Sequence, residues 1–204
     1  MPEVSAESFF STWCATIEEF LPDLIKDWWS NAHFTKKVLS DDCSVIRCVA
    51  QRLGLQCYCE YYKLDAVLFR PSDKVPYAPE RETWLRRVRV AFEHENESRS
   101  GLYQEVAHLL ITDCDHRVLV TYSTDQAHLR AELGRLHDLV SETDRASTLA
   151  GSGGLQIIVG STNAVQDSVL WQSFVYRLDG WFESQVEMKL QPTLPGIPTI
   201  LETR

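Results

Sequence analysis

The fold of this chain is decided by residues 84–96, which read WLRRVRVAFEHEN. Branched and aromatic side chains in the first part of this stretch favour a β-strand, in which successive side chains point to opposite faces. Glu93 and Glu95 therefore lie on one face of the predicted strand, and Phe92 and His94 lie on the other. Two carboxylates only roughly 6–7 Å apart repel one another. We therefore expect them to be solvated at an edge or to bind a cation.

A partner for this strand precedes it in the sequence. Residues 55–70, LQCYCEYYKLDAVLFR, are rich in aromatic and branched side chains. They predict one long strand or two strands joined by a tight turn. Residues 71–83 contain several prolines and predict a loop. We therefore expect residues of about 60–70 to pair in antiparallel fashion with residues of about 85–96.

The remaining segments alternate between helical and strand patterns. Apolar residues at helical spacing predict a first helix over 7–30, in which Pro22 is expected to introduce a kink or a break. The further predicted elements are a helix from Asp41 or Asp42 to Leu53, a helix opening at Ser98 or Ser100, a central strand at 116–123, a helix at 125–146, a flexible loop at 149–154, a strand at 155–161 and a C-terminal hairpin turning at 178–180. This order predicts an α/β fold with a single mixed central sheet flanked by helices.

Length and composition limit the possible architectures. A chain of 204 residues with 44% hydrophobic residues suits one folded domain with a substantial core. We expect that domain to span residues 1–190 and to be followed by an extended tail at 191–204. The sequence lacks an apolar run of about 18 residues, and its first residues lack the pattern of a secretory signal. These features predict a cytoplasmic protein that does not interact with membranes.

The charge distribution bears on possible partners. A net charge of −9 argues against avid non-specific binding to nucleic acid, but it leaves room for a local basic groove. The densest positive cluster consists of Arg81, Arg86, Arg87 and Arg89. These side chains are candidates for contacts with DNA phosphates, or they are partners of nearby acidic residues.

The cysteines do not form a recognisable metal or disulfide framework. The chain has six of them, and Cys57 and Cys59 form a C-x-C pair within an apolar stretch. Closely spaced Cys and His pairs of the kind that bind zinc are absent from the sequence. The six cysteines are therefore expected to be free thiols in a reducing compartment.

Three carboxylates are expected to converge in the sheet. Asp65 interrupts an apolar stretch, and strand alternation places it on the face of Lys63 and Val67. Antiparallel pairing would bring Asp65 close to Glu93 and Glu95. Carboxylate oxygens are preferred ligands of Mg²⁺, so the three acids predict a site for Mg²⁺ or Mn²⁺. The alternatives are a solvated acidic strand end for the two glutamates and an edge-strand charge that discourages aggregation for Asp65.

This arrangement resembles the PD-(D/E)xK nuclease superfamily, which has a restriction-endonuclease-like fold. The matching residues are Leu64-Asp65 for the first half of the motif and Glu93-His94-Glu95 for the second, within an α-β-β-α-β core over about 40–123. The resemblance implies that Asp65 and Glu93 are metal ligands. It also implies that Glu95 stands where a catalytic Lys is usual and that Lys63 is a candidate for a Lys that has moved to the neighbouring strand.

The resemblance also implies supporting residues in the flanking helices. Glu18 or Glu19 would supply an acid from the first helix, and Gln104 would match a glutamine of the next helix. Glu97 offers a second acid-x-acid register with Glu95, but the register of Glu93 and Glu95 is preferred because it directly follows the buried part of the strand.

The leading hypothesis is therefore a Mg²⁺-dependent endonuclease that acts on DNA, with Asp65, Glu93, Glu95 and Lys63 as site residues. The competing hypothesis is a catalytically inactive nuclease-fold protein that binds a protein partner or a second copy of itself. A third reading is a small α/β scaffold whose acidic residues only cover its surface.

Overall fold

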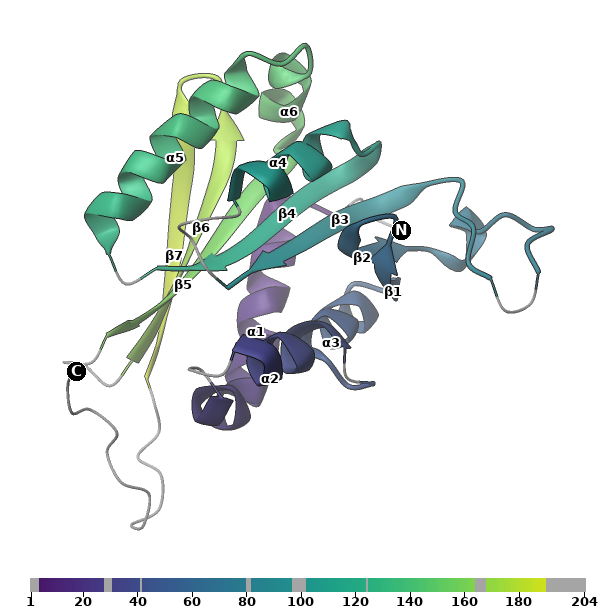
Figure 1. Cartoon of the computed structure of the whole chain (residues 1–204), viewed down its shortest axis with the longest axis horizontal. Helices are drawn as coiled ribbons and strands as arrows, with labels where there is room; N and C mark the ends of the chain where they lie inside the picture. The colour runs from purple at the N-terminus through teal and green to yellow at the C-terminus, as the bar shows by residue number, and fades with distance from the viewer. Residues whose placement is uncertain are drawn as a thin grey trace.

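The computed structural model describes residues 4–27, 31–40, 42–79, 82–96, 102–123, 125–163 and 168–189. In these ranges the chain forms an α/β fold around one mixed sheet of seven strands, whose spatial order is the order of the sequence (Figure 1). The strands are β1 (Gln56–Tyr61), β2 (Leu64–Phe69), β3 (Val88–Glu95), β4 (Cys114–Tyr122), β5 (Leu155–Asn163), β6 (Ser168–Arg177) and β7 (Gly180–Lys189). The predicted fold class is confirmed.

Helices cover both faces of this sheet. The elements on one face are α1 (Ala6–Asp27), α2 (Asn31–Thr35), the π-helix η1 (Lys36–Ser40) and α3 (Val45–Arg52); those on the other are α4 (Leu102–Ile111), α5 (Gln126–Ser141) and α6 (Ala146–Ser152) (Figure 1). A short 3₁₀ helix, η2 (Pro71–Asp73), follows β2. Two apolar cores result, one on each side of the sheet.

The strand pairing places β3 and β4 near the middle of the sheet. β2 pairs with β1 and with β3 in antiparallel fashion, whereas β3, β4 and β5 run parallel to one another. The parallel pairing of β3 and β4 requires a crossover, and α4 provides it. The predicted antiparallel partner of β3, the central strand β4 and the C-terminal hairpin of β6 and β7 are confirmed.

The stretch 55–70 forms two strands, and the turn between them corrects one prediction. Tyr62 and Lys63 form the turn with φ angles of 48° and 75°, in the left-handed region. β2 starts only at Leu64, so strand alternation does not extend to Lys63. The prediction that Lys63 shares a strand face with Asp65 is wrong for this reason, and the Lys63 side chain is exposed at the turn.

Three helical predictions also differ from the structure. Pro22 lies inside α1, which continues from Ala6 to Asp27, so the predicted break does not occur there; Leu21 and Leu24 on either side of it are buried. The N-cap residue of α3 is Ser44 rather than an aspartate. Residues 149–154, expected to form a flexible loop, instead include the end of α6, whose Leu149 is buried against the sheet. In that segment, packing outweighs the low helix propensity of glycine and serine.

Some predictions lie outside the described residues. They concern Arg81, Glu97 and the tail at 191–204. Within the described ranges, none of the helices has both the length and the apolar character needed to cross a bilayer.

Candidate functional site

Asp65 and Glu93 face each other where regular pairing of β2 with β3 ends. The last pair in the register is Ala66 with Phe92, which places Asp65 opposite Glu93. The two carboxylates then bond to the backbone across the strands. The Asp65 amide donates to Glu93 Oε2 over 3.0 Å, and the His94 amide donates to Asp65 Oδ2 over 2.8 Å. The sequence thus correctly predicted that these two acids meet.

Helix α4 adds two further polar side chains to this pair. Glu105 and His108 lie one turn apart on α4, which packs against β3 and β4. His108 Nδ1 is 3.3 Å from Glu93 Oε1 and 3.5 Å from Glu105 Oε2. One potential ligand atom from each of Glu93, Glu105 and His108 lies within 4.8 Å of the other two. We refer to Asp65, Glu93, Glu105 and His108 as the carboxylate site.

Within the carboxylate site, Glu93 is shielded from water, and this affects its protonation. Glu93 is only 1% exposed. Burial, with added repulsion from the Asp65 and Glu105 carboxylates, raises the pKa of Glu93 to about 9. Burial also raises the pKa of Asp65 above its usual range, although the hydrogen bond from the His94 amide opposes this effect. Within the described residues, no Lys or Arg side chain forms an ion pair with Asp65, Glu93 or Glu105.

The other predicted site residues, Glu95 and Lys63, lie outside the carboxylate site. Glu95 is on β3, two residues beyond Glu93, and its charge contributes to the raised pKa of Asp65. It is therefore electrostatically coupled to the carboxylate site, although it is not one of the three residues whose ligand atoms cluster. Lys63 lies in the exposed turn between β1 and β2.

His94 points to the opposite face of the sheet, as predicted from strand alternation. Its ring is buried and stacks on Phe34, with Nε2 3.0 Å from the Tyr122 hydroxyl. Burial lowers the pKa of His94 to about 3, so the ring is neutral. His94 supports the carboxylate site from the other face of the sheet. Its backbone amide donates a hydrogen bond to Asp65, and its side chain packs against the core on the far side of β3.

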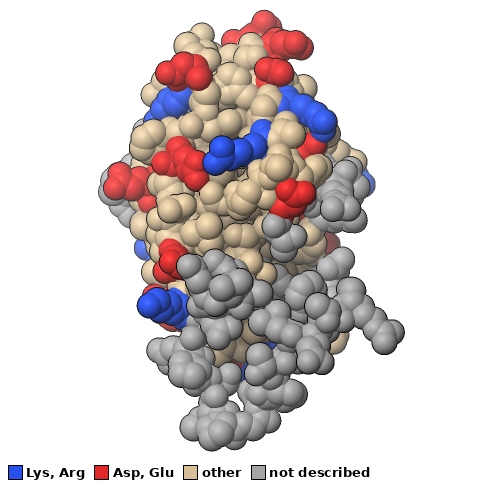
Figure 2. Space-filling view, turned by 90° about the vertical axis from the view of Figure 1, so that its left-hand side faces the viewer, with Lys and Arg blue, Asp and Glu red and all other residues tan. Residues whose placement is uncertain are grey.

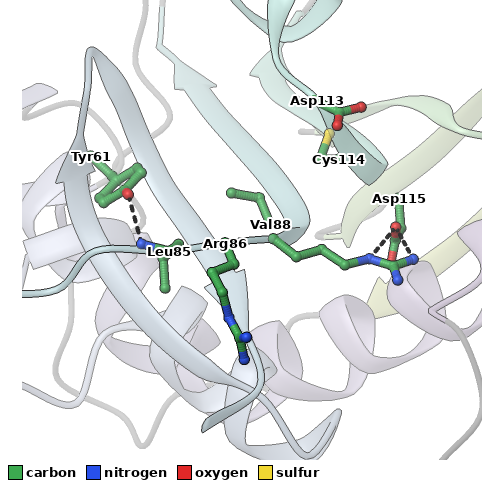
Figure 3. Close-up of a pocket in the computed structure, with 8 residues that line it drawn as sticks. Tyr61, Leu85, Arg86, Val88, Asp113, Cys114 and Asp115 are labelled. Carbon is green, nitrogen blue, oxygen red and sulfur yellow. Dashed lines mark hydrogen bonds and ion pairs between the residues drawn. The ribbon is translucent and has the colours of Figure 1, made fainter. Parts of the chain in front are cut away.

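The predicted arginine cluster is largely engaged by nearby acidic residues. Arg89 is mostly buried and forms ion pairs with Asp73 and Asp115. Arg87 also pairs with Asp115, with a 2.7 Å distance from Nη2 to Oδ1. Figure 3 shows Asp115 beside a pocket, joined by dashed lines to a guanidinium group, with Arg86 pointing away from Asp115. The described part of this cluster is therefore mostly neutralised within the protein.

Neither this pocket nor the face drawn in Figure 2 shows a concentration of positive charge. The pocket is lined by Arg86 and Arg87 but also by Asp113 and Asp115. Figure 2 shows the side of the molecule on which α5 and β7 lie, and its described part carries acidic and basic side chains interspersed. Neither region has the continuous basic surface expected of a strong non-specific contact with DNA.

The predicted helper residues of the flanking helices do not reach the carboxylate site. Glu18 and Glu19 are exposed on α1, on the opposite face of the sheet, and Glu19 pairs with Arg52. Gln104 is exposed on α4. Two other residues of α4 do reach the site: Glu105, which follows Gln104 in the sequence, and His108. Neither was predicted from the sequence.

A divalent cation fits the donor set of the carboxylate site. The clustered ligand atoms include carboxylate oxygens of Glu93 and Glu105, with Asp65 adjacent to Glu93, and these three acids lack Lys or Arg ion pairs within the described ranges. His108 adds an imidazole nitrogen, a ligand that transition metals favour over Mg²⁺. The site therefore suits Mn²⁺ at least as well as the Mg²⁺ expected from the sequence.

Comparison of this chain with protein-family models, with curated proteins and with solved structures finds no match.

Proposed function

We propose that this protein is a metal-dependent, nuclease-like hydrolase that cleaves DNA phosphodiester bonds with metal-activated water. The observation that carries the proposal is the meeting of Asp65 and Glu93 on paired strands, with Glu105 and His108 beside them. The carboxylates of such a group repel one another in a shielded environment. A bound cation would remove that repulsion, which gives a physical reason for the arrangement.

Each residue of the site has a role in this proposal. Glu93, Glu105 and His108, whose ligand atoms cluster, would hold the ion together with the adjacent Asp65. A divalent cation bound there would lower the pKa of a coordinated water and stabilise the charge that develops on the phosphodiester. Glu95 would accept a hydrogen bond from the attacking water, at the position where the superfamily that this chain resembles usually has a Lys.

The first experiment measures metal binding. Titration calorimetry with MnCl₂ and with MgCl₂ should detect binding to the wild-type protein, with Mn²⁺ bound more tightly because of the imidazole ligand. Asp65→Asn and Glu93→Gln should each weaken Mn²⁺ binding by at least about tenfold, the effect of about 1.4 kcal/mol. Asp179→Asn is the matched control, because Asp179 is exposed in the turn between β6 and β7.

The second experiment measures cleavage of plasmid and single-stranded DNA in the presence of Mn²⁺ or Mg²⁺. Wild-type protein and Asp179→Asn should cleave, whereas Asp65→Asn and Glu93→Gln should be inactive while retaining their circular dichroism spectra. Cleavage by either variant at the wild-type rate would refute the assignment of Asp65 and Glu93.

A second candidate function is a nuclease-fold protein that binds a partner without cleaving DNA. Two observations favour it: the usual Lys is replaced by Glu95, and Arg87 and Arg89 are occupied by internal ion pairs. Metal binding that depends on Glu93 but is accompanied by no cleavage of any DNA form would favour this candidate. If the protein neither binds metal nor cleaves DNA, the hydrolase proposal is refuted and only this second candidate remains.

A further inference from the structure

Two cysteines lie side by side on the outermost strand of the sheet. Cys57 and Cys59 are separated by one residue on β1, so their side chains point to the same face. Their sulfur atoms are 3.9 Å apart, and both side chains are half-buried against the core beside α3 and η1. All six cysteines of the chain are free thiols, so this close pair is reduced in the structure.

Neighbouring groups lower the pKa of one cysteine of this pair and raise the pKa of the other. The Cys57 thiol, which lies beside the Cys59 sulfur, and the positive charge of Arg47 lower the pKa of Cys59 to about 7. The Cys59 sulfur also lies 3.0 Å from the Leu39 carbonyl oxygen, a contact that favours the thiol form. The hydrogen bond to Cys59, together with burial, raises the pKa of Cys57. Ionisation of this pair is therefore favoured at the Cys59 sulfur rather than at the Cys57 sulfur.

We infer that Cys57 and Cys59 are a site of reversible oxidation, at which a peroxide converts the two thiols into an intramolecular disulfide. The Cys59 thiolate attacks one peroxide oxygen, so that an S–O bond forms, the O–O bond breaks and the leaving hydroxide takes up a proton to become water. The Cys57 sulfur then attacks the Cys59 sulfenic acid. The S–S bond forms, the S–O bond breaks, and a second water leaves with the Cys57 proton. Two electrons pass from the thiols to one peroxide molecule.

Formation of the disulfide would disturb β1. The sulfur atoms must approach by about 2 Å to reach bonding distance. In an extended strand the two Cα atoms are about 6.6 Å apart, near the upper limit for a disulfide, so β1 must contract. Cys59 pairs with Ala66, the residue after Asp65. Oxidation is therefore expected to loosen the β1–β2 hairpin next to the carboxylate site, but the modification itself does not depend on the proposed nuclease function.

Peptide mapping tests this inference directly. Trypsin cuts after Arg52 and Lys63, and the resulting peptide contains Cys57 and Cys59 but no other cysteine. The full-length protein is treated with hydrogen peroxide, its remaining thiols are alkylated, and it is digested. The peptide should be lighter than its reduced form by two hydrogen atoms and carry no alkyl group. Treatment with dithiothreitol before alkylation should restore the doubly alkylated peptide.

Two variants separate this mechanism from general oxidation. Cys57→Ser should stop at a Cys59 sulfenic acid that dimedone traps, whereas Cys48→Ser should form the disulfide as the wild type does. Three results would overturn the proposal. The first is a doubly alkylated peptide after peroxide treatment, and the second is a wild-type protein in which Cys59 is oxidised while Cys57 remains a thiol. The third is a disulfide that joins this pair to Cys43 or Cys48. Hydrogen exchange of the β1–β2 hairpin should become faster on oxidation, and unchanged exchange would overturn its coupling to the neighbouring strand.

Discussion

Raising the pH should destabilise the metal-free protein, because the folded state holds a proton on Glu93. This side chain is 1% exposed, and burial raises its pKa from an ordinary value of 4.5 to about 9. Between these two pH values, folded Glu93 is protonated while unfolded Glu93 is ionised. The folded state thus binds one more proton than the unfolded state, and the free energy of unfolding falls as the pH rises. The loss ends once the pH exceeds the folded pKa.

The magnitude follows from this difference of one proton. One bound proton changes the free energy of unfolding by about 1.4 kcal/mol per pH unit. Between about pH 6 and about pH 8 the wild-type protein should therefore lose roughly 2–3 kcal/mol through this group. Glu93→Gln has the shape of the protonated side chain and does not ionise. It should match the wild type at or below about pH 4.5, and its advantage in stability should grow by roughly 2–3 kcal/mol between about pH 6 and about pH 8.

Urea unfolding with EDTA present, carried out for both proteins at several pH values, measures this difference. Titrating groups remote from Glu93 contribute equally to the two proteins, so the difference between their slopes reports Glu93 together with the carboxylates that interact with it. Equal slopes would refute the reasoning about Glu93. Addition of Mn²⁺ in place of EDTA should remove much of the loss in the wild type, because the ion displaces the proton and binds more tightly as the pH rises.

Three further substitutions test the packing behind the site. Arg89→Ala should lower the free energy of unfolding by about 3–5 kcal/mol in urea titrations, since it leaves the buried Asp73 carboxylate without this partner; a loss below about 1 kcal/mol would contradict this. Tyr122→Phe should lower it by about 1–3 kcal/mol by removing the hydroxyl that meets the His94 ring, and equal stability would argue against that bond. Gly160→Ala should lower the melting temperature, with a loss of about 1–3 kcal/mol, because its Cβ would lie 2.9 Å from aromatic ring atoms; an unchanged melting temperature would count against such tight packing.

The sequence was sufficient to bring Asp65 and Glu93 together because strand alternation and antiparallel pairing are local rules. The register of β2 with β3 follows from two apolar stretches joined by one loop. Lys63 was misplaced because the turn residues Tyr62 and Lys63 adopt left-handed φ angles without being the glycine or asparagine that usually marks such a turn. Nothing in their side chains distinguishes that turn from a continuing strand.

The contribution of α4 was missed although the sequence contained a signal for it. Glu105 and His108 are three residues apart and flank the buried stripe of Val106 and Leu109, so helical geometry places them beside the sheet. The orientation of α4 over β3 could not be predicted from the sequence, because it depends on the crossover between the parallel strands β3 and β4. Glu105 and His108 could have been selected as candidate site residues because they border an apolar stripe. Their contact with Glu93 on the sheet could not have been predicted in the same way.

The balance of charge at the carboxylate site bears on the role proposed for Glu95. A Lys at position 95 would bring a positive charge to the acids, whereas Glu95 adds a negative charge that already affects Asp65. Within the described ranges no Lys or Arg side chain forms an ion pair with Asp65, Glu93 or Glu105, and protonation or a bound cation would relieve their repulsion. A bound divalent cation would supply the compensating charge at Glu93 and its neighbours, so metal binding is the property to measure first.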